Sequence, residues 1–484
     1  MPRQDLQITP YPNKITLTGG SVAADVTPEL NYDEGLPKEG YRLELAAQGI
    51  KITAADESGA FYARQSLKQL SFAAQDGQIP CCVIEDAPRF EYRGFMLDCA
   101  RHMTAIEDIK KLIDAMALMK LNYFHWHLTD DQGWRVHIHK YPRLTEIGSF
   151  RKGSHFGHES THSEEVYGGH YTHDELREII AYCAERHITV VPELDLPGHT
   201  TCAIAAHPEL SCTGLQLEVG TKQGIYKDIL CVGKDEVLQF VYDVLEEFCS
   251  IFPGEYFHIG GDEAPKKRWR ECEKCQQRMK DEGLENEQQL QGWFNKKIAA
   301  FLAERGKKTI VWNEGLYSGK MGDEVIAQRW FDPGRFALRF ANKGGKVIMS
   351  EEHSNYLDYP YGRTPLKKTY KYNALCKGLS DEGKANVIGV EAPCWTEHMR
   401  DFTRVGYMVF PRLCALAENG WTPEQAKDYK GFMRRLPSLM RQLHGIGITT
   451  AAPRAWNPPF AQRIKQTLQQ AKGIYRADYP CTGD

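Results

Sequence analysis

Eight short apolar runs, most of them separated by helix-like segments, constrain the fold of this chain more than any other feature. They read RGFMLDCA, YFHWHL, TVVPELDL, YFHIG, KTIVWNE, VIAQRW, KVIMSE and VIGVEAPCW. Strands that alternate with amphipathic helices indicate βα units and a parallel sheet. Eight of them, without a phosphate loop, favour a (β/α)8 TIM barrel over a doubly wound sheet. Functional side chains are then expected where the strands end.

The remaining sequence divides around this barrel. YRLELAAQGIKITAAD predicts two strands and SGAFYARQSLKQLSF a helix, so residues 1–88 form a small α+β domain. Residues 89–450 form the barrel, and residues 451–484 a helical extension that packs on it. After the first run, Thr104 and Glu107 suggest a capping box at the start of a helix. The fold class is therefore α/β, a TIM barrel preceded by a small α+β domain.

Composition excludes several classes of protein. The 60 basic and 64 acidic residues give a net charge of -4, which does not favour nucleic acid as a partner. No apolar run approaches the roughly 18 residues of a membrane span, so no membrane is expected. The start, MPRQDLQITPYP, lacks the pattern of a secretory signal. As written the chain is expected in the cytoplasm, or in the periplasm or outside the cell if a leader has been removed.

The 14 cysteines are scattered, which indicates reduced thiols more than a disulfide framework. Cys272 and Cys275 in RECEKCQQRM have the spacing of half a zinc site. Because no second pair lies nearby in the sequence, we interpret them as free thiols near a helix start and expect no metal and no cofactor.

Acids, aromatic residues and an arginine follow the predicted strands. In chain order they are Arg101, His102, Asp130, Asp131, Asp195, His199, Asp262, Glu263, Trp312, Glu314, Trp330, Tyr356, Asp358, Trp395 and Glu397. Carboxylates bind sugar hydroxyls and protonate leaving oxygens, while indole rings cover the apolar faces of sugars. The pattern therefore predicts a glycoside hydrolase.

The stretch YFHIGGDEAP places two carboxyl groups side by side after an apolar strand. Neighbours on a strand point to opposite sides, so Asp262 and Glu263 can share a pocket only where the strand has ended. The two preceding glycines permit such a bend. Burial and a neighbouring negative charge raise a carboxyl pKa, which provides the protonated form that a general acid needs.

HIGGDE, together with LDCARHM, HWHLTDDQGWR, PELDLPGHT, VWNEG and CWTE in that order, resembles the β-N-acetylhexosaminidases of glycoside hydrolase family 20. The resemblance runs from about Arg93 to Trp421, and the N-terminal domain is similar to the one that commonly precedes this barrel. It implies an exo-acting, retaining enzyme in which the 2-acetamido oxygen of the substrate is the nucleophile, an exception to the two-carboxylate scheme. The expected partner is a glycan or chito-oligosaccharide, and a homodimer is left open.

The resemblance also assigns roles. Glu263 would protonate the glycosidic oxygen and later activate water, Asp262 would bind the acetamido nitrogen, and Tyr356 would bind the acetamido carbonyl. The other assignments are Trp312, Trp330 and Trp395 as walls around the acetamido group, Arg101 and Glu397 at the 3- and 4-hydroxyls, Asp358 at the 6-hydroxyl, and Asp130 with His199 as a relay to Glu263.

Three alternatives stand beside this assignment. A metal-dependent barrel hydrolase would use His125 and His127, with His137 and His139 close behind. A sugar-binding protein on an inactive barrel would lack the acid at Glu263. An enzyme of the same fold that releases a disaccharide, lacto-N-biosidase-like, would have a more open pocket.

Two irregular segments, 148–171 and 202–231, are expected to overhang the catalytic face. The sequence does not separate N-acetylglucosamine from N-acetylgalactosamine, which differ only at the 4-hydroxyl.

Overall fold

The computed structural model describes residues 6–155 and 162–471. The outermost parts of the predicted N-terminal domain and C-terminal extension, and the centre of the 148–171 segment, lie outside these residues. Within them, no helix has the length and apolar character to cross a membrane.

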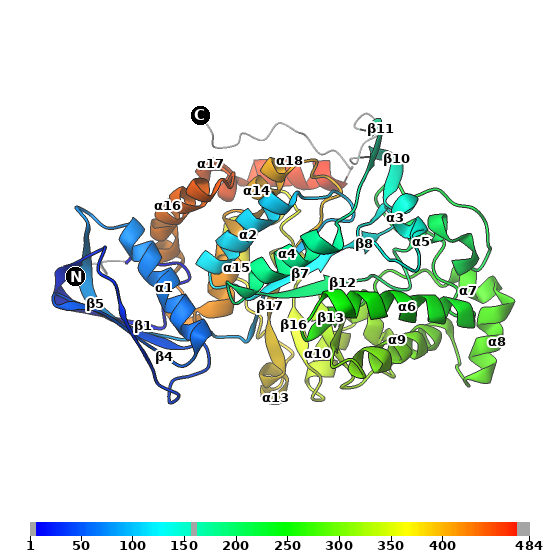
Figure 1. Cartoon of the computed structure of the whole chain (residues 1–484), viewed down its shortest axis with the longest axis horizontal. Helices are drawn as coiled ribbons and strands as arrows, with labels where there is room; N and C mark the ends of the chain where they lie inside the picture. Colours follow the sequence, from blue (N-terminus) through cyan, green and yellow to red (C-terminus); the bar gives the residue numbers. More distant parts are fainter. Residues whose placement is uncertain (1–5, 156–161, 472–484) are drawn as a thin grey trace.

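Eight parallel strands close into a barrel (Figure 1). In spatial order they are β12 (Thr189–Glu193), β13 (Tyr256–His258), β14 (Lys308–Trp312), β15 (Val325–Arg329), β16 (Val347–Met349), β17 (Val387–Cys394), β6 (Tyr92–Asp98) and β7 (Tyr123–His127). Each of the eight predicted runs overlaps one of these strands, so the predicted fold class is confirmed.

Helices surround the barrel and follow its strands. The longer ones are α2 (Ile106–Leu118), α4 (His173–Ala184), α6 (Asp235–Ile251), α8 (Glu273–Asp281), α9 (Glu287–Ala303), α14 (Phe402–Val409), α15 (Arg412–Trp421), α16 (Tyr429–Ile446) and α18 (Phe460–Ala471). The shorter ones are α3 (Arg143–Glu146), α5 (Thr201–Ala206), α7 (Lys267–Glu271), α10 (Phe336–Ala341), α11 (Glu352–Asn355), α12 (Leu366–Tyr370), α13 (Asp381–Ala385) and α17 (Pro453–Trp456). Three 3-10 turns complete the set, at Pro208–Leu210, Asn313–Ser318 and Glu424–Ala426.

The predicted capping box is wrong. Helix α2 begins at Ile106 after Ala105, and no side chain caps it. The reason is that the backbone amide and carbonyl of Thr104 both bond to the hydroxyl of Tyr171, at 3.2 and 2.7 Å, which draws Thr104 away from the helix start.

A five-stranded sheet precedes the barrel, in the order β1 (Lys14–Ala23), β5 (Gln78–Asp86), β3 (Tyr41–Ala46), β4 (Gly49–Ala54) and β2 (Glu29–Tyr32). Helix α1 (Glu57–Phe72) packs on it and is capped by the side chain of Asp56. A buried ion pair of 2.9 Å joins Asp86 of the sheet to Lys120 beside the barrel. Because both side chains are fully buried, this contact fixes the sheet against the barrel.

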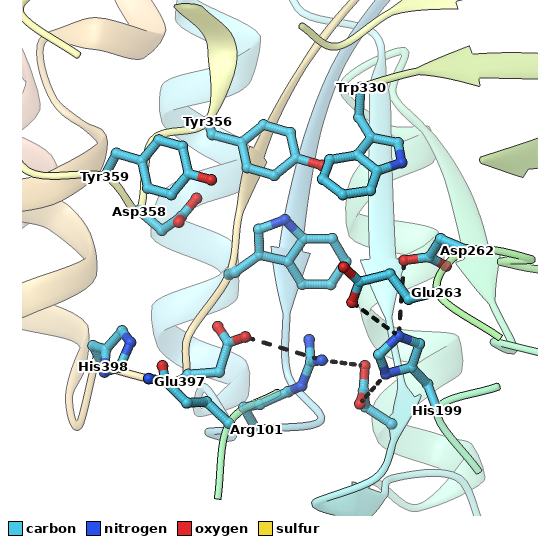
Figure 2. Close-up of a pocket in the computed structure, with 13 residues that line it drawn as sticks. Arg101, His199, Asp262, Glu263, Trp330, Tyr356, Asp358, Tyr359, Glu397 and His398 are labelled. Carbon is cyan, nitrogen blue, oxygen red and sulfur yellow. Dashed lines mark hydrogen bonds and ion pairs between the residues drawn. The ribbon is translucent and has the colours of Figure 1, made fainter. Parts of the chain in front are cut away.

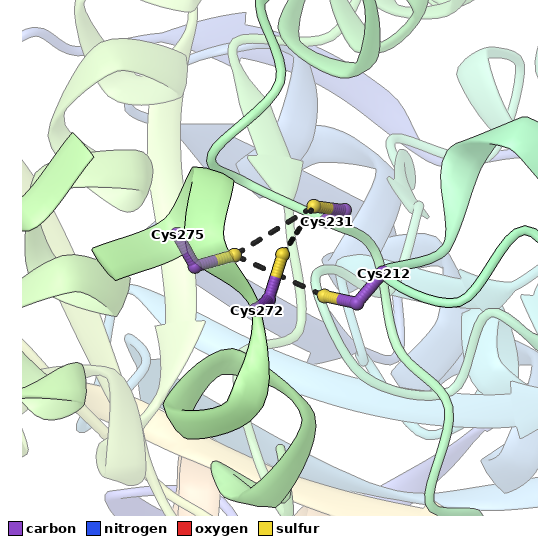
Figure 3. A group of neighbouring side chains, drawn as sticks. All are labelled: Cys212, Cys231, Cys272 and Cys275. Carbon is purple, nitrogen blue, oxygen red and sulfur yellow. Dashed lines mark hydrogen bonds between the residues drawn. The ribbon is translucent and has the colours of Figure 1, made fainter. Parts of the chain in front are cut away.

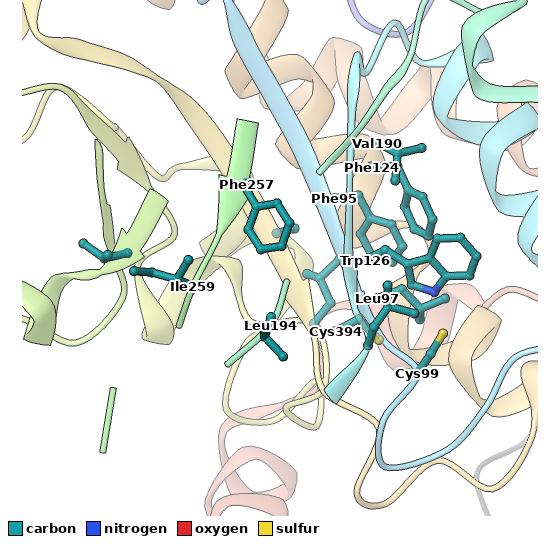
Figure 4. Close-up of a cluster of buried hydrophobic side chains, with 14 of the residues drawn as sticks. Phe95, Leu97, Cys99, Phe124, Trp126, Val190, Leu194, Phe257, Ile259 and Cys394 are labelled. Atoms are coloured by element: carbon teal, nitrogen blue, oxygen red, sulfur yellow. The ribbon is translucent and has the colours of Figure 1, made fainter. Parts of the chain in front are cut away.

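The strands separate an apolar exterior from a layered interior. Outward-facing side chains such as Phe95, Phe124 and Phe257 pack under the helices (Figure 4). Alternate residues face inward, and at the amino-terminal end they form an apolar layer of Tyr92, Tyr123, Val191, Tyr256, Ile310, Ile326 and Ile348. Further along the strands the interior becomes polar, with His125, His258, Glu193 and Glu391. The polar layers lie directly below the carboxyl ends of the strands, where function is expected in a barrel.

Candidate active site

A cavity of about 210 Å³ opens at the carboxyl end of the barrel (Figure 2). Its lining residues are Arg101, Asp130, His199, Gln223, Asp262, Glu263, Trp330, Tyr356, Asp358, Tyr359, Trp395, Glu397 and His398. The lining includes every residue to which the resemblance assigns a role except Trp312, which lies just below it. The other strand-end residues, His102, Asp131, Asp195 and Glu314, are not part of it. The strand ends therefore converge on one pocket.

The backbone after β13 is bent as the sequence suggested. Gly260 and Gly261 have φ values of +64° and +101°, and a Cβ on Gly260 would lie 1.7 Å from a carboxyl oxygen of Asp195. Glu263 is also in the left-handed region, with φ of +45°, and its N–H donates to the Glu314 carboxylate at 2.7 Å. This hydrogen bond compensates for an unfavourable backbone conformation. Both acidic side chains reach the pocket as a result.

The electrostatics of the pair are asymmetric. Burial raises the pKa of Asp262 to about 8, the charges of Glu314 and Glu263 act in the same direction, and His199 opposes them. One oxygen of Asp262, Oδ1, is buried without a hydrogen-bond partner. Glu263 is more exposed, with about a third of its side chain accessible (34%). Asp262 Oδ1 can therefore accept a hydrogen bond from a ligand.

A chain of charged groups runs beneath the pair. His199 Nε2 lies 3.7 Å from Glu263 and 3.9 Å from Asp262, and its Nδ1 lies 3.1 Å from Asp130. Asp130 also pairs with Arg101 at 2.6 Å. Burial opposes ionisation of Asp130, yet Arg101 and His199 hold its pKa well below the usual range. Burial likewise opposes charging of His199, but Asp130 raises its pKa well above normal. Figure 2 shows this continuous path from Glu397 through Arg101 to Glu263.

Aromatic rings form the walls of the pocket. The Trp330 and Tyr356 rings lie nearly parallel, with centroids 6.1 Å apart and planes 20° apart. Trp395 lies 6.4 Å from Tyr356 and 5.9 Å from Trp312 between ring centroids. Trp312 is buried and its Nε1 donates to Glu193 at 2.9 Å, so it supports Trp395 from below. A flat substituent would fit between these faces.

The opposite side of the pocket is polar. Arg101 Nη2 lies 4.0 Å from Glu397, and the guanidinium sits 5.1 Å from the centre of the Trp395 ring. Burial, reinforced by the charge of Glu397, raises the pKa of Asp358 to about 8. Asp358 Oδ1 is also buried without a hydrogen-bond partner. Two acids and an arginine therefore line this side of the pocket, and Asp358 keeps an oxygen free to accept a hydrogen bond from a polar ligand.

The histidines considered as metal ligands are held in a network below the pocket. His127 contacts Glu193 through Nδ1 and Asp130 through Nε2, the latter at 2.9 Å. His125 Nδ1 lies 2.9 Å from Glu391 and its Nε2 3.1 Å from Glu193. Their nitrogens therefore already face carboxylates in a fully buried layer. His137 contacts Thr145, and His139 pairs with Glu247 at the surface, away from the pocket.

Sequence reasoning missed several contributors. Gln223, Tyr359 and His398 line the pocket but follow no strand directly. Glu193, which pairs with three histidines, was hidden inside the PELDLPGHT motif as a strand residue. The inward alternation of β12 was the available signal, because it places Glu193 on the same side as Val191.

Both irregular segments reach the rim of the pocket. The first forms a hairpin of β10 (Phe150–His155) and β11 (His162–Gly168), so it is more regular than expected. The His155 N–H donates to Thr221 of the second segment at 2.8 Å. Both border a small cavity next to Arg101 and Glu397. A separate short hairpin pairs β8 (Thr129–Asp130) with β9 (Gly133–Trp134) and carries Asp130.

Comparisons with known proteins agree with this geometry. The profile for the catalytic domain of glycosyl hydrolase family 20 matches residues 90–424, and that for domain 2 of the same family matches residues 6–87. A β-hexosaminidase of Porphyromonas gingivalis is 40% identical over 473 residues, which cover 93% of this chain and 60% of that protein. A β-hexosaminidase of Akkermansia muciniphila is 36% identical, with 85% of each chain covered.

A solved structure is also similar. The exo-β-N-acetylglucosaminidase of Vibrio harveyi, in complex with N-acetylglucosamine, has a TM-score of 0.84 and 31% identity. The match covers 93% of this chain and 79% of that one. The fold and the sequence thus point to the same relatives.

Proposed function

This chain belongs to glycoside hydrolase family 20, and we propose that it is an exo-acting, retaining β-N-acetylhexosaminidase. It removes terminal N-acetylhexosamine from the non-reducing end of a glycan such as a chito-oligosaccharide. The activity is carried to this chain from relatives, one of which it matches over 60% of that protein's length.

One observation carries the proposal: two consecutive acids enter a single small pocket, Asp262 buried and Glu263 at the open side. Most glycosidases use two carboxyl groups on opposite sides of the scissile bond, one as acid and one as nucleophile or base. Two consecutive residues do not fit that arrangement. Asp262, with its raised pKa and its unpartnered oxygen, suits a hydrogen bond to the substrate's acetamido N–H. Glu263, at the open side, suits proton transfer to the leaving group.

The first step breaks the glycosidic bond. Glu263 donates its proton to the glycosidic oxygen, while the acetamido oxygen of the same sugar attacks the anomeric carbon and forms an oxazolinium ion. Asp262 is mostly neutral in the free pocket. It releases its proton to solvent when the acetamido N–H binds it, and as a carboxylate it then stabilises the positive charge that develops on the acetamido nitrogen. Tyr356 donates a hydrogen bond to the acetamido oxygen, and the tryptophan walls hold that group in the attacking position.

In the second step, the Glu263 carboxylate takes a proton from water as the water attacks the anomeric carbon. The oxazolinium ring opens, and the sugar leaves with its β configuration retained. His199 is a positioning residue in this scheme, because it lies between Asp130 and Glu263 and keeps the carboxyl oriented. The surrounding low-dielectric walls strengthen each of these interactions.

The polar end of the pocket explains exo action. Arg101 and Glu397 are placed to bind the 3- and 4-hydroxyls, and Asp358 to bind the 6-hydroxyl. The cavity of about 210 Å³ is smaller than the roughly 300–1,000 Å³ of pockets for drug-sized ligands. A single sugar therefore fits better than the disaccharide of a lacto-N-biosidase-like enzyme.

The decisive experiment changes the nucleophile. Aryl β-glycosides of N-acetylglucosamine with one, two or three fluorines on the acetyl group become progressively poorer substrates if the acetamido oxygen attacks, because fluorine withdraws its electrons. We expect log kcat/KM to fall steadily through the series for the native chain and to fall little for Asp262→Asn, in which residual hydrolysis depends less on that attack. A flat series for the native enzyme would reject substrate assistance, and hydrolysis of a disaccharide glycoside alone would favour the larger-unit enzyme.

A further inference from the structure

Four cysteines from distant parts of the chain lie close together, two of them at the ends of the pocket loop, residues 212–231. Cys272 and Cys275 were interpreted as free thiols because no other pair is near them in sequence. The fold brings Cys212 and Cys231 against them (Figure 3). The Sγ atom of Cys231 lies 3.6 Å from the Sγ atoms of both Cys272 and Cys275. The Sγ atom of Cys212 lies 3.8 Å from that of Cys275.

We propose that Cys212, Cys231, Cys272 and Cys275 form a structural zinc site. Four thiolates bound to one zinc at about 2.3 Å in a tetrahedron lie about 3.8 Å from one another. The observed separations match that figure and are far longer than the roughly 2.05 Å of a disulfide. All four sulfurs lie within 4.8 Å of one another, which encloses one ion and leaves no room for a cluster of irons and sulfides.

The surrounding backbone prepares this arrangement. Cys231 N–H donates to the Leu210 carbonyl at 2.8 Å, and a bridge between Ser211 and Leu230 places Cys212 and Cys231 side by side. Gly233 approaches the other pair so closely that a Cβ would lie 2.4 Å from the Cys275 nitrogen. Only glycine permits this approach, so the two pairs are held together by the chain itself.

The environment suits an anionic complex. Cys272 precedes α8 and Cys275 lies in its first turn, where exposed N–H groups and the helix dipole favour negative charge. Binding releases the four thiol protons to solvent and leaves a zinc tetrathiolate of net charge -2, which the helix end partly offsets. Two of the four cysteines are buried and two are half-buried, as expected for a closed structural site that presents no open position.

The site would tie the pocket loop to the segment that follows the acid pair. Between Cys212 and Cys231 the chain runs past the pocket, where Gln223 lines the cavity and the Gly220 N–H donates to Asp131 at 2.9 Å. Trp269 of α7 donates to the Leu230 carbonyl at 2.9 Å from the other side. Zinc therefore stabilises a loop on the leaving-group side of the pocket.

The test measures metal before activity. The full chain, expressed with zinc and purified under reducing conditions, is expected to contain one zinc per chain by elemental analysis. Cys212→Ser and Cys272→Ser should each lose at least nine-tenths of that zinc and unfold at a lower temperature. Cys249→Ser, which removes a half-buried thiol in α6, is the matched control and should keep both properties. If the variants fail to fold, the native protein produced with cobalt in place of zinc still tests the site. A tetrahedral cobalt tetrathiolate gives intense thiolate-to-cobalt absorption.

Several results would overturn the proposal. These are a folded, reduced native chain without metal, iron in place of zinc, a mass showing hydrogens lost to disulfides, zinc retained in both variants, or zinc lost with no change in thermal unfolding. None of these readouts depends on glycosidase activity, so the zinc site and the proposed function are tested separately.

Discussion

Two groups of buried carboxyls lie one above the other inside the same barrel, and they are in opposite states. In the pocket, burial raises the pKa of both Asp262 and Asp358 to about 8. In the layer below, burial opposes ionisation of Glu193 as well, but His127, His258 and His125 hold its pKa well below normal. Burial is common to both groups, so the partners make the difference.

This contrast separates scaffold from function. In the Glu193 layer each carboxylate faces side-chain donors of the protein, and the network fixes the upper ends of the strands. Each of the pocket carboxyls Asp262 and Asp358 has a buried oxygen without a protein partner, which a ligand can satisfy. Perturbed pKa values toward the neutral form, in a cleft, are characteristic of functional acids. The following predictions test whether the two layers behave as differently as their surroundings indicate.

Glu263→Gln is expected to have the largest effect. Loss of a general acid costs about 10²- to 10⁴-fold in rate, so kcat/KM for a chito-oligosaccharide should fall by that factor. With a 4-nitrophenyl glycoside the loss in the bond-breaking step should be much smaller, because nitrophenolate leaves without protonation. Stopped-flow and steady-state assays on both substrates measure the difference. Glu107→Gln, on the exposed face of α2, is the control. Equal losses on the two substrates would contradict the assignment of Glu263 as the acid.

Glu193→Gln should damage the lower layer instead. Removing one partner from a buried ion network costs about 3–5 kcal/mol, so the free energy of unfolding in urea should fall by that order. Because the pKa of Glu193 is depressed in the folded state, its contribution is present above the unfolded pKa and is lost as pH falls through the folded value. The loss in free energy of unfolding, relative to the native chain, should therefore be complete at pH 7 and become smaller at acidic pH. A variant as stable as the native chain at pH 7 would show that the network is not a scaffold.

Asp262→Asn tests the pocket without disturbing the fold. Removal of one preorganised electrostatic contact to a transition state costs about 10²–10³ in rate, and here it should do so equally for good and poor leaving groups, unlike Glu263→Gln. Stability at neutral pH should not fall and should rise, because Asp262 with a pKa of about 8 must take up a proton on folding there and asparagine need not. Asp174→Asn, at a fully exposed position, is the matched control. Parallel kinetics and thermal melts decide the matter, and a strong loss of stability would place Asp262 with the scaffold.

The sequence predicted the barrel because its periodicity is local: each of the eight runs is apolar and is followed by turn-forming or helical residues. It predicted the pocket because strand ends of a barrel must converge. It did not predict the role of Glu193, since a carboxylate inside an apolar run is recognised only when its partners from β7 and β13 are known. The Cys212 and Cys231 contacts were missed for the same reason, as they close across 41 and 63 residues of chain.

Asp358→Asn is the most specific test, because its effect on stability appears only as pH rises. The folded pKa of about 8 lies above that of an unfolded aspartate, so the folded state binds the proton more tightly and loses stability as pH rises from about 4 to 8. Asparagine removes that charge, so the variant should match the native chain near pH 4 and become more stable than it by pH 8. A difference of one in pKa corresponds to about 1.4 kcal/mol, which thermal melts over this pH range resolve. Glu193→Gln should show the reverse trend, with its deficit growing as pH rises. If both variants moved in the same direction, the partners of the two layers would not account for their opposite charge states.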